Sequence, residues 1–283
     1  MEQDVSSTEE ERIPLLELDA LQTYFFTDIG TARSVDGVSY SIYAGETVGV
    51  VGESGCGKSV TALSIMGLIP KPPGKIIGGA IRFRGQDLTK FTERQLRQIR
   101  GNDIAMIFQE PMTSLNPVYT VGDQIMEAIL IHNEGVSRKE ARQRAIDMLR
   151  KVGIPSPDKR VDEYPHQLSG GMRMRVSIAR ALITDPGLLL MDEPFGALDE
   201  IGRHRLNDEL LGLWCDRRWT CLFVTHSVQE AAFLSQRVVV MSAQPGRIRA
   251  VHEVDFPYPR PRSLRTDPEF GRLVARISDD LEG

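Results

Sequence analysis

The segment that most constrains the fold of this chain is the loop 52–59 with its two flanks. An apolar run, 46–51, leads into Gly-Glu-Ser-Gly-Cys-Gly-Lys-Ser, which fits the pattern G-x-x-x-x-G-K-[ST], and a helix-like stretch, 58–68, follows. Such a loop between a strand and a helix wraps its backbone amides around phosphate groups, while its lysine reaches the outer phosphates and its last hydroxyl can ligate Mg²⁺. A flexible Gly/Ser turn, the alternative, would not need this context. The predicted phosphate-binding residues are Gly52, Ser54, Gly55, Cys56, Gly57, Lys58, Ser59 and Val60.

Composition argues against several other classes of function. The 283 residues are 41% hydrophobic and 26% charged, which is ordinary for a globular protein. Lys and Arg number 34 against 39 Asp and Glu, giving a net charge of −5 and no basic surface for nucleic acid. No stretch approaches the roughly 18 apolar residues of a membrane span. If the protein serves a membrane, we expect it to dock on another polypeptide.

The order of the predicted elements indicates a mostly parallel α/β sheet with additions. Strands are expected at 15–26, 37–43, 46–51, 104–108, 188–191, 221–225 and 238–241, with helices between most of them. From 109 to 167 no strand pattern appears, whereas 121–132 and 137–152 read as helices, the second opening with the capping box Ser137 and Glu140. We predict a disordered leader at 1–13, a main domain at 14–255 with a helical subdomain at about 110–167, and a C-terminal tail at 256–283.

A second motif places two acids at the end of a buried strand. The apolar run 188–191 is followed by Asp192 and Glu193. At the carboxyl end of a parallel strand these acids can reach a bound nucleotide, Asp192 near Mg²⁺ and Glu193 facing the attacking water. Taken alone, the pair fits a solvated strand end equally well, so the interpretation depends on the phosphate loop.

A third motif, 168–172, reads Leu-Ser-Gly-Gly-Met and precedes a helical run at 173–183. It offers a serine and exposed amides at a second helix N-terminus. An ordinary serine N-cap would explain these residues by themselves. One chain does not need two such sites for one phosphate tail, so the second site calls for a different explanation.

With these three motifs in place, the chain resembles the ABC-type ATPases over about 15–255. The resemblance implies an α/β fold of the P-loop NTPase type, an ABC nucleotide-binding domain with an N-terminal antiparallel β subdomain and a helical insertion. It implies ATP and Mg²⁺ as cofactors. Ser169, Gly170 and Gly171 would contact the γ-phosphate held by the loop of an opposing subunit.

Further positions match the motifs of this family. Gln109 corresponds to the glutamine that senses Mg²⁺ and the membrane partner, His226 to the histidine that contacts the γ-phosphate, and Asp199 to the aspartate that links two subunits. Phe25 is the predicted adenine-stacking aromatic, with Tyr24 as the alternative and core packing as the competing explanation. The implied catalytic residues are thus Glu193, His226 and Gln109, and the implied metal ligands are Ser59, Gln109 and Asp192.

Two groups of importers share the resemblance. Residues 14–175 resemble dipeptide and oligopeptide importer ATPases through 51–59, 106–117 and 164–167, whereas the chain from Val176 onward is similar to nitrate, sulfonate and taurine importer ATPases through 191–199, 224–227, 239–248 and 256–262. A hybrid of the two groups is therefore predicted. Because the helical insertion touches the membrane subunits in this family, we favour a peptide importer, with a nitrate, sulfonate or taurine importer as the alternative.

The resemblance also implies partners and a location. These are a second ATPase subunit, identical or a sister chain, two transmembrane permease subunits and, indirectly, a periplasmic or surface substrate-binding protein, at the cytoplasmic face of the inner (plasma) membrane. No nucleic acid is expected. ABC ATPases that act on DNA or ribosomes form a different class, but the first needs long coiled coils between the phosphate loop and the third motif, and the second needs two cassettes in one chain.

Overall fold

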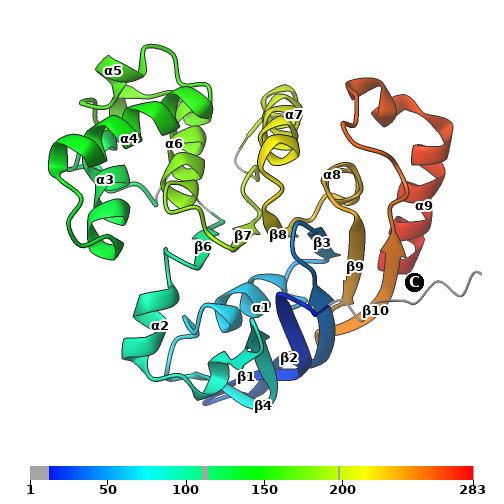
Figure 1. The fold of residues 1–283 in the computed structure, drawn as a ribbon. Helices are drawn as coiled ribbons and strands as arrows, with labels where there is room; N and C mark the ends of the chain where they lie inside the picture. The colour runs from blue at the N-terminus through cyan, green and yellow to red at the C-terminus, as the bar shows by residue number, and fades with distance from the viewer. Residues whose placement is uncertain (1–12, 110–113, 197, 283) are drawn as a thin grey trace, which may run out of the picture.

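The computed structural model describes residues 13–109, 114–196 and 198–282, and Figure 1 shows their arrangement. The predicted leader at 1–13 lies outside the described residues except for Ile13. A six-stranded sheet occupies the centre, in the order β10-β9-β3-β8-β7-β6. Its strands are β3 (Thr47–Gly52), β6 (Ile104–Ile107), β7 (Leu188–Asp192), β8 (Thr220–Val224), β9 (Arg237–Ser242) and β10 (Arg247–Glu253). All pairs are parallel except β9 with β10.

The central strands are continuous apolar runs because both faces of the sheet are covered. In β3, Val48 and Val50 belong to one hydrophobic core, whereas Val51 belongs to another. Figure 1 shows the two coverings, α6 to α9 on one face and α1 with the antiparallel strands on the other. A strand buried on both sides loses the alternation of polar and apolar residues, which is typical of parallel sheets.

A second sheet, fully antiparallel, has the order β2-β1-β4-β5. Its strands are β1 (Leu16–Thr27), β2 (Gly30–Ile42), β4 (Gly74–Phe83) and β5 (Gln86–Asp87). The predicted N-terminal antiparallel β subdomain is confirmed. β2 begins at Gly30, before the predicted 37; the prediction started too late because residues 30–33 are exposed and carry no apolar signal. β4 was not predicted, because Gly78 and Gly79 interrupt its apolar pattern.

Helices follow β6, where the strand pattern stops in the sequence. They are α3 (Val121–His132), α4 (Arg138–Lys151), the short α5 (Pro157–Arg160) and α6 (Gly170–Leu182). The hydroxyl of Thr120 caps α3 and that of Ser137 caps α4, each accepting a backbone N–H of the first turn. On α4, Ala141, Ala145 and Leu149 form the buried face. α3 and α4 lie where the sequence predicts helices, α6 begins three residues before the predicted 173, and α5 was not predicted. The subdomain limits at about 110–167 stay a prediction.

The other helices are α1 (Lys58–Ile65), α2 (Glu93–Ile99), α7 (Glu200–Arg217), α8 (Val228–Leu234) and α9 (Pro268–Glu282), with 3₁₀ turns η1 (Leu88–Lys90), η2 (Pro165–Gln167) and η3 (Arg262–Thr266). α9 packs against α8, β9 and β10, so the described part of the predicted tail is an integral layer of the fold. The buried guanidinium of Arg260 fixes this segment by donating to the carbonyls of Ala232, Phe233 and Ser235. Among the helices described, none has both the length and the hydrophobicity to cross a bilayer.

Candidate functional site

The loop 52–59 connects β3 to α1 and is shaped by close backbone contacts. Gly57 has φ 95°, and a Cβ built there would lie 2.1 Å from the carbonyl oxygen of Ser34 on β2. Gly246, in the turn before β10, approaches equally closely, since its Cβ would lie 2.2 Å from the Ser34 oxygen and 2.4 Å from that of Cys56. Backbone atoms from two distant segments, at Ser34 and at Gly246, therefore hold the loop, and only glycine fits at both contacts.

Gly57→Ala is expected to destabilise the protein well beyond the strain of a positive φ. Gly55→Ala is the matched control, because Gly55 has φ 81° but no atom of the described residues lies within 4 Å of its Cβ position. The control should cost about 1 kcal/mol, or roughly 2–4 °C in thermal midpoint, and Gly57→Ala at least about twice that. Thermal unfolding without nucleotide measures both variants. Equal shifts would show that the contact with Ser34 is unimportant.

The Lys58 side chain is held inside the loop. Its Nζ donates to the carbonyl oxygens of Gly52 (2.7 Å) and Glu53 (2.9 Å) and lies 3.9 Å from Oε1 of Glu193. With only 4% of the residue exposed, the ammonium is oriented by the loop. A fixed positive charge at this position suits the outer phosphates of a nucleotide.

The remaining loop residues divide by accessibility. Ser54 and Gly55 are exposed, whereas the Cys56 side chain is fully buried and Val60 packs against the core. The Cys56 side chain therefore cannot face a phosphate, whereas Val60 remains partly exposed. Their role in nucleotide binding stays a prediction.

Ser59, in the first turn of α1, and Asp192, at the carboxyl end of β7, lie together. The Ser59 hydroxyl donates to Oδ1 of Asp192 at 2.8 Å. Burial raises the pKa of Asp192 above its usual value, and the hydrogen bond from Ser59 opposes that shift. A hydroxyl beside one carboxylate fits Mg²⁺, which uses hard oxygen ligands and takes most of its coordination from water and substrate phosphates. In the described part of the chain no group of three or more His, Cys, Asp or Glu side chains could hold a metal ion.

Glu193 is the residue on which the other candidate catalytic groups converge. Its carboxylate lies 3.4 Å from Nε2 of Gln109 and 3.3 Å from Nδ1 of His226, in addition to the contact with Lys58. The backbone has φ 45°, a conformation rare for residues with a side chain, and its N–H donates to the carbonyl of Val224 at 2.8 Å. Such strain persists where surrounding structure imposes it and is concentrated at functional sites.

The third motif and Asp199 occupy helix N-termini. Ser169 caps α6 by accepting the N–H of Met172 at 3.3 Å, and Asp199 caps α7 by accepting that of Gly202 at 2.7 Å. Among the described residues, a Cβ at Gly171 would meet no atom within 4 Å, so this part of the protein leaves the start of α6 open to an incoming group. α6 packs against α3, α4 and β6, on the side of the molecule away from β10. Contacts of Ser169, Gly170, Gly171 and Asp199 with another subunit stay predictions.

The two candidate aromatic residues face different surroundings on β1. The Phe25 ring is half-buried and packs against Gly74, where a Cβ would lie 2.9 Å from the ring. Tyr24 is buried, its hydroxyl donates to Asp36 at 2.6 Å, and the Arg33 guanidinium lies over its ring. Neither arrangement tests adenine stacking, which stays a prediction for Phe25 with Tyr24 as the alternative.

One buried polar group beside this site, Glu230, was not predicted from the sequence. Glu230 on α8 has 7% exposure and contacts Thr225, Asn207 and Arg203. A signal was present, because Glu230 is a charged residue within the apolar run of 228–234. Charged side chains are buried only with partners.

Comparison with known proteins finds one family and many relatives. Residues 35–196 match the family model described as ABC transporter. The probable peptide ABC transporter ATP-binding protein y4tR of Sinorhizobium fredii is 46% identical over 95% of this chain and 78% of its own length. The dipeptide transport ATP-binding protein DppD of Escherichia coli is 45% identical over 93% and 81%, and the oligopeptide transport ATP-binding protein AppD of Bacillus subtilis is 48% identical over 80% and 69%.

Solved structures with the same fold include a dimer of MJ0796, a bacterial ABC transporter cassette, with a TM-score of 0.75 and 26% identity over 86% of this chain and all of that one. A second dimer of MJ0796, in a post-hydrolysis state bound to ADP and Pi, has a TM-score of 0.74 and 25% identity over the same shares of both chains. The peptide-transport relatives align with up to 95% of the chain and so extend past Val176. The separate likeness of the C-terminal part to nitrate, sulfonate and taurine importers stays a prediction.

Proposed function

The chain belongs to the ABC transporter family and is one of its ATPases, and on this premise we propose that it powers the import of peptides through separate membrane subunits. The convergence of Lys58, Gln109 and His226 on the Glu193 carboxylate is the observation that carries the catalytic part. The substrate class is supported by relatives that are 45–48% identical and named for peptide, dipeptide and oligopeptide transport. A nitrate, sulfonate or taurine importer is the second candidate, on the sequence of 191–262.

The residues suit a hydrolytic step in which the protein supplies position and charge. Lys58 would hold the outer phosphates, and Ser59, Asp192 and Gln109 would hold Mg²⁺, which supplies charge neutralisation at the phosphates when bound. The Glu193 carboxylate would accept a proton from the attacking water, and His226, 3.3 Å away, would orient that carboxylate and the γ-phosphate.

We propose further that two subunits close over each nucleotide. The open N-terminus of α6 at Ser169 would face the γ-phosphate bound by a partner, and the dimeric MJ0796 cassettes support this arrangement. Backbone amides at a helix N-terminus favour a negatively charged group, so loss of the γ-phosphate would weaken the closed dimer. Closure and opening would then move the helices α3 to α5.

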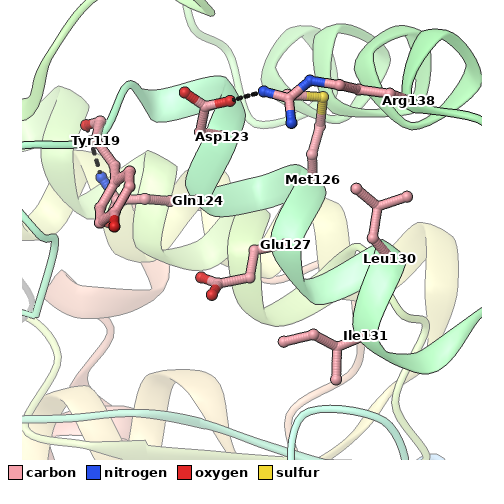
Figure 2. Close-up of a pocket in the computed structure, with 8 residues that line it drawn as sticks. All are labelled: Tyr119, Asp123, Gln124, Met126, Glu127, Leu130, Ile131 and Arg138. Carbon is pink, nitrogen blue, oxygen red and sulfur yellow. Dashed lines mark hydrogen bonds and ion pairs between the residues drawn. The ribbon is translucent and has the colours of Figure 1, made fainter.

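The surface proposed for the permease lies on α3 and is shown in Figure 2. A groove of about 480 Å³ is lined by Tyr119, Asp123, Gln124, Met126, Glu127, Leu130, Ile131 and Arg138. The groove exposes apolar side chains, with Ile131 67% and Tyr119 55% accessible, and it is bordered by Asp123 and Arg138, which form an ion pair at 2.6 Å. Apolar residues exposed together within a polar rim mark protein interaction sites. Docking here would place the chain at the cytoplasmic face of a membrane.

Ile131→Glu is expected to abolish co-purification with the permease subunits and the stimulation of ATPase activity that they cause. Val251→Glu, also an exposed apolar residue but on β10 at the far edge of the sheet, should leave both intact. Tagged chain is purified with the permease subunits of a peptide importer and, separately, with those of a sulfonate importer, and phosphate release is measured. If only the permease subunits of the sulfonate importer stimulated the ATPase activity, the proposed peptide importer would be replaced by the second candidate, a nitrate, sulfonate or taurine importer.

A further inference from the structure

Glu230 lies beneath the loop that carries His226 and is bound to both sides of it. The Thr225 hydroxyl donates to Oε2 of Glu230 at 2.7 Å and accepts the N–H of Ser227 at 3.1 Å. The N–H of Glu230 donates to the Ser227 hydroxyl at 3.2 Å. Thr225, before His226, is therefore held by the buried carboxylate of Glu230, and Ser227, after it, by the backbone N–H of the same residue.

The same carboxylate reaches α7, which begins directly after Asp199. Oε1 of Glu230 accepts a hydrogen bond from Nδ2 of Asn207 at 3.3 Å and lies 3.8 Å from Nε of Arg203. Nη2 of Arg203 donates to the carbonyl of Leu198 at 3.2 Å, next to Asp199. A continuous set of polar contacts thus joins the His226 loop to the Asp199 loop within one subunit.

Two polar atoms in this set of contacts make no hydrogen bond to the described residues. Nε of Arg203 and Oδ1 of Asn207 are buried and have no hydrogen-bond partner among the described residues. Nε would need to move only about 1 Å to reach hydrogen-bond distance from Glu230. A polar cavity of about 330 Å³, lined by Arg203, Asn207 and Glu230 among others, adjoins them and gives room for that movement. A buried donor without a partner is costly, so an arrangement that pairs it is favoured.

We propose that Glu230 is a positioning residue that couples the two loops: when Asp199 engages the opposing subunit, Arg203 moves onto Glu230 and fixes the His226 loop toward the γ-phosphate. This inference rests on the proposed closure of two subunits over ATP. Because coupling is reciprocal, binding of the γ-phosphate at His226 also favours the engaged arrangement of the Asp199 loop. A residue that only stabilised the fold would change the melting temperature without changing cooperativity.

The test uses the full-length chain with Glu230→Gln, Arg203→Met and the double variant. Each single variant should lower kcat about tenfold and bring the Hill coefficient for ATP toward one, while binding of ATP to the monomer changes less than about twofold. The double variant should be no slower than the worse single variant, because both remove one coupling. In a Glu193→Gln background, each should also reduce the ATP-dependent dimer seen by light scattering.

Glu46→Gln is the matched control. Glu46 is also a largely buried carboxylate paired with an arginine, Arg237, but it stands just before β3, at the amino end of that strand, whereas His226 follows the carboxyl end of β8. It should lower the thermal midpoint without changing the Hill coefficient. Thr225→Val should reproduce the loss of cooperativity, and Thr225→Ser should retain it, which keeps the test decisive if Glu230→Gln folds poorly. Multiplying losses in the double variant, or cooperativity unchanged in all of them, would overturn the coupling. A parent chain that forms no dimer with ATP would instead overturn the proposed function.

Discussion

Glu193→Gln is expected to lower steady-state ATP turnover at least about 100-fold while leaving ATP binding nearly intact. Glutamine keeps the size of the side chain and its contacts with Gln109 and His226, but it cannot accept a proton from water. Phosphate release gives the rate, and a fluorescent ATP analogue gives the affinity. The variant should accumulate as an ATP-bound dimer on size-exclusion chromatography with light scattering.

Glu53→Gln is the control for this result, because Glu53 is an exposed glutamate in the loop 52–59 whose carbonyl, not its carboxylate, contacts Lys58. It should turn over ATP within about twofold of the parent. Near-normal turnover by Glu193→Gln would remove Glu193 from the catalytic role and leave Gln109 and His226 without a common partner.

Lys58→Met should act one step earlier and weaken ATP binding about 100-fold. The substitution removes charge-assisted hydrogen bonds to the outer phosphates, each worth about 1.5–3 kcal/mol. The affinity is measured by equilibrium binding with and without Mg²⁺. Lys90→Met, which changes a lysine whose side chain is 82% exposed, should bind ATP as the parent does.

The two substitutions together separate binding from chemistry. Glu193→Gln should bind and not turn over, whereas Lys58→Met should do neither. If Lys58→Met kept its affinity and lost only turnover, the ammonium would act on the transition state alone. Its bonds to Gly52 and Glu53 would then be the main reason for its burial.

Much of the fold could be predicted because it depends on local patterns. The apolar runs at β3, β7, β8 and β9 are short and continuous, and the caps Thr120 and Ser137 define two helices by their own hydrogen bonds. β10 carries no such signal, since alternate residues are exposed and none of its residues is fully buried. The packing of α9 depends on Arg260 and on contacts with residues far away in sequence, which no local pattern reports.

The candidate site divides in the same way. Lys58, Ser59 and Asp192 follow from strand ends that meet at one edge of a parallel sheet. The left-handed backbone of Glu193 does not follow, because the hydrogen bond to Val224 that accompanies it comes from a neighbouring strand. Glu230 was missed for a related reason: its partners lie on α7 and on the His226 loop, and only the three-dimensional arrangement brings them together.

The backbone contacts of Ser34 and Gly246 with the loop 52–59 make ATP binding dependent on complete folding of the domain. Ser34 and Gly246 are separated by most of the chain, yet both must be in place before the loop 52–59 has its shape. A shortened protein ending after β9 would still contain the lysine, both acids and the histidine. It would lack the segment that closes around the loop, so nucleotide capture by a nascent or truncated chain should begin only once β10 has joined the sheet.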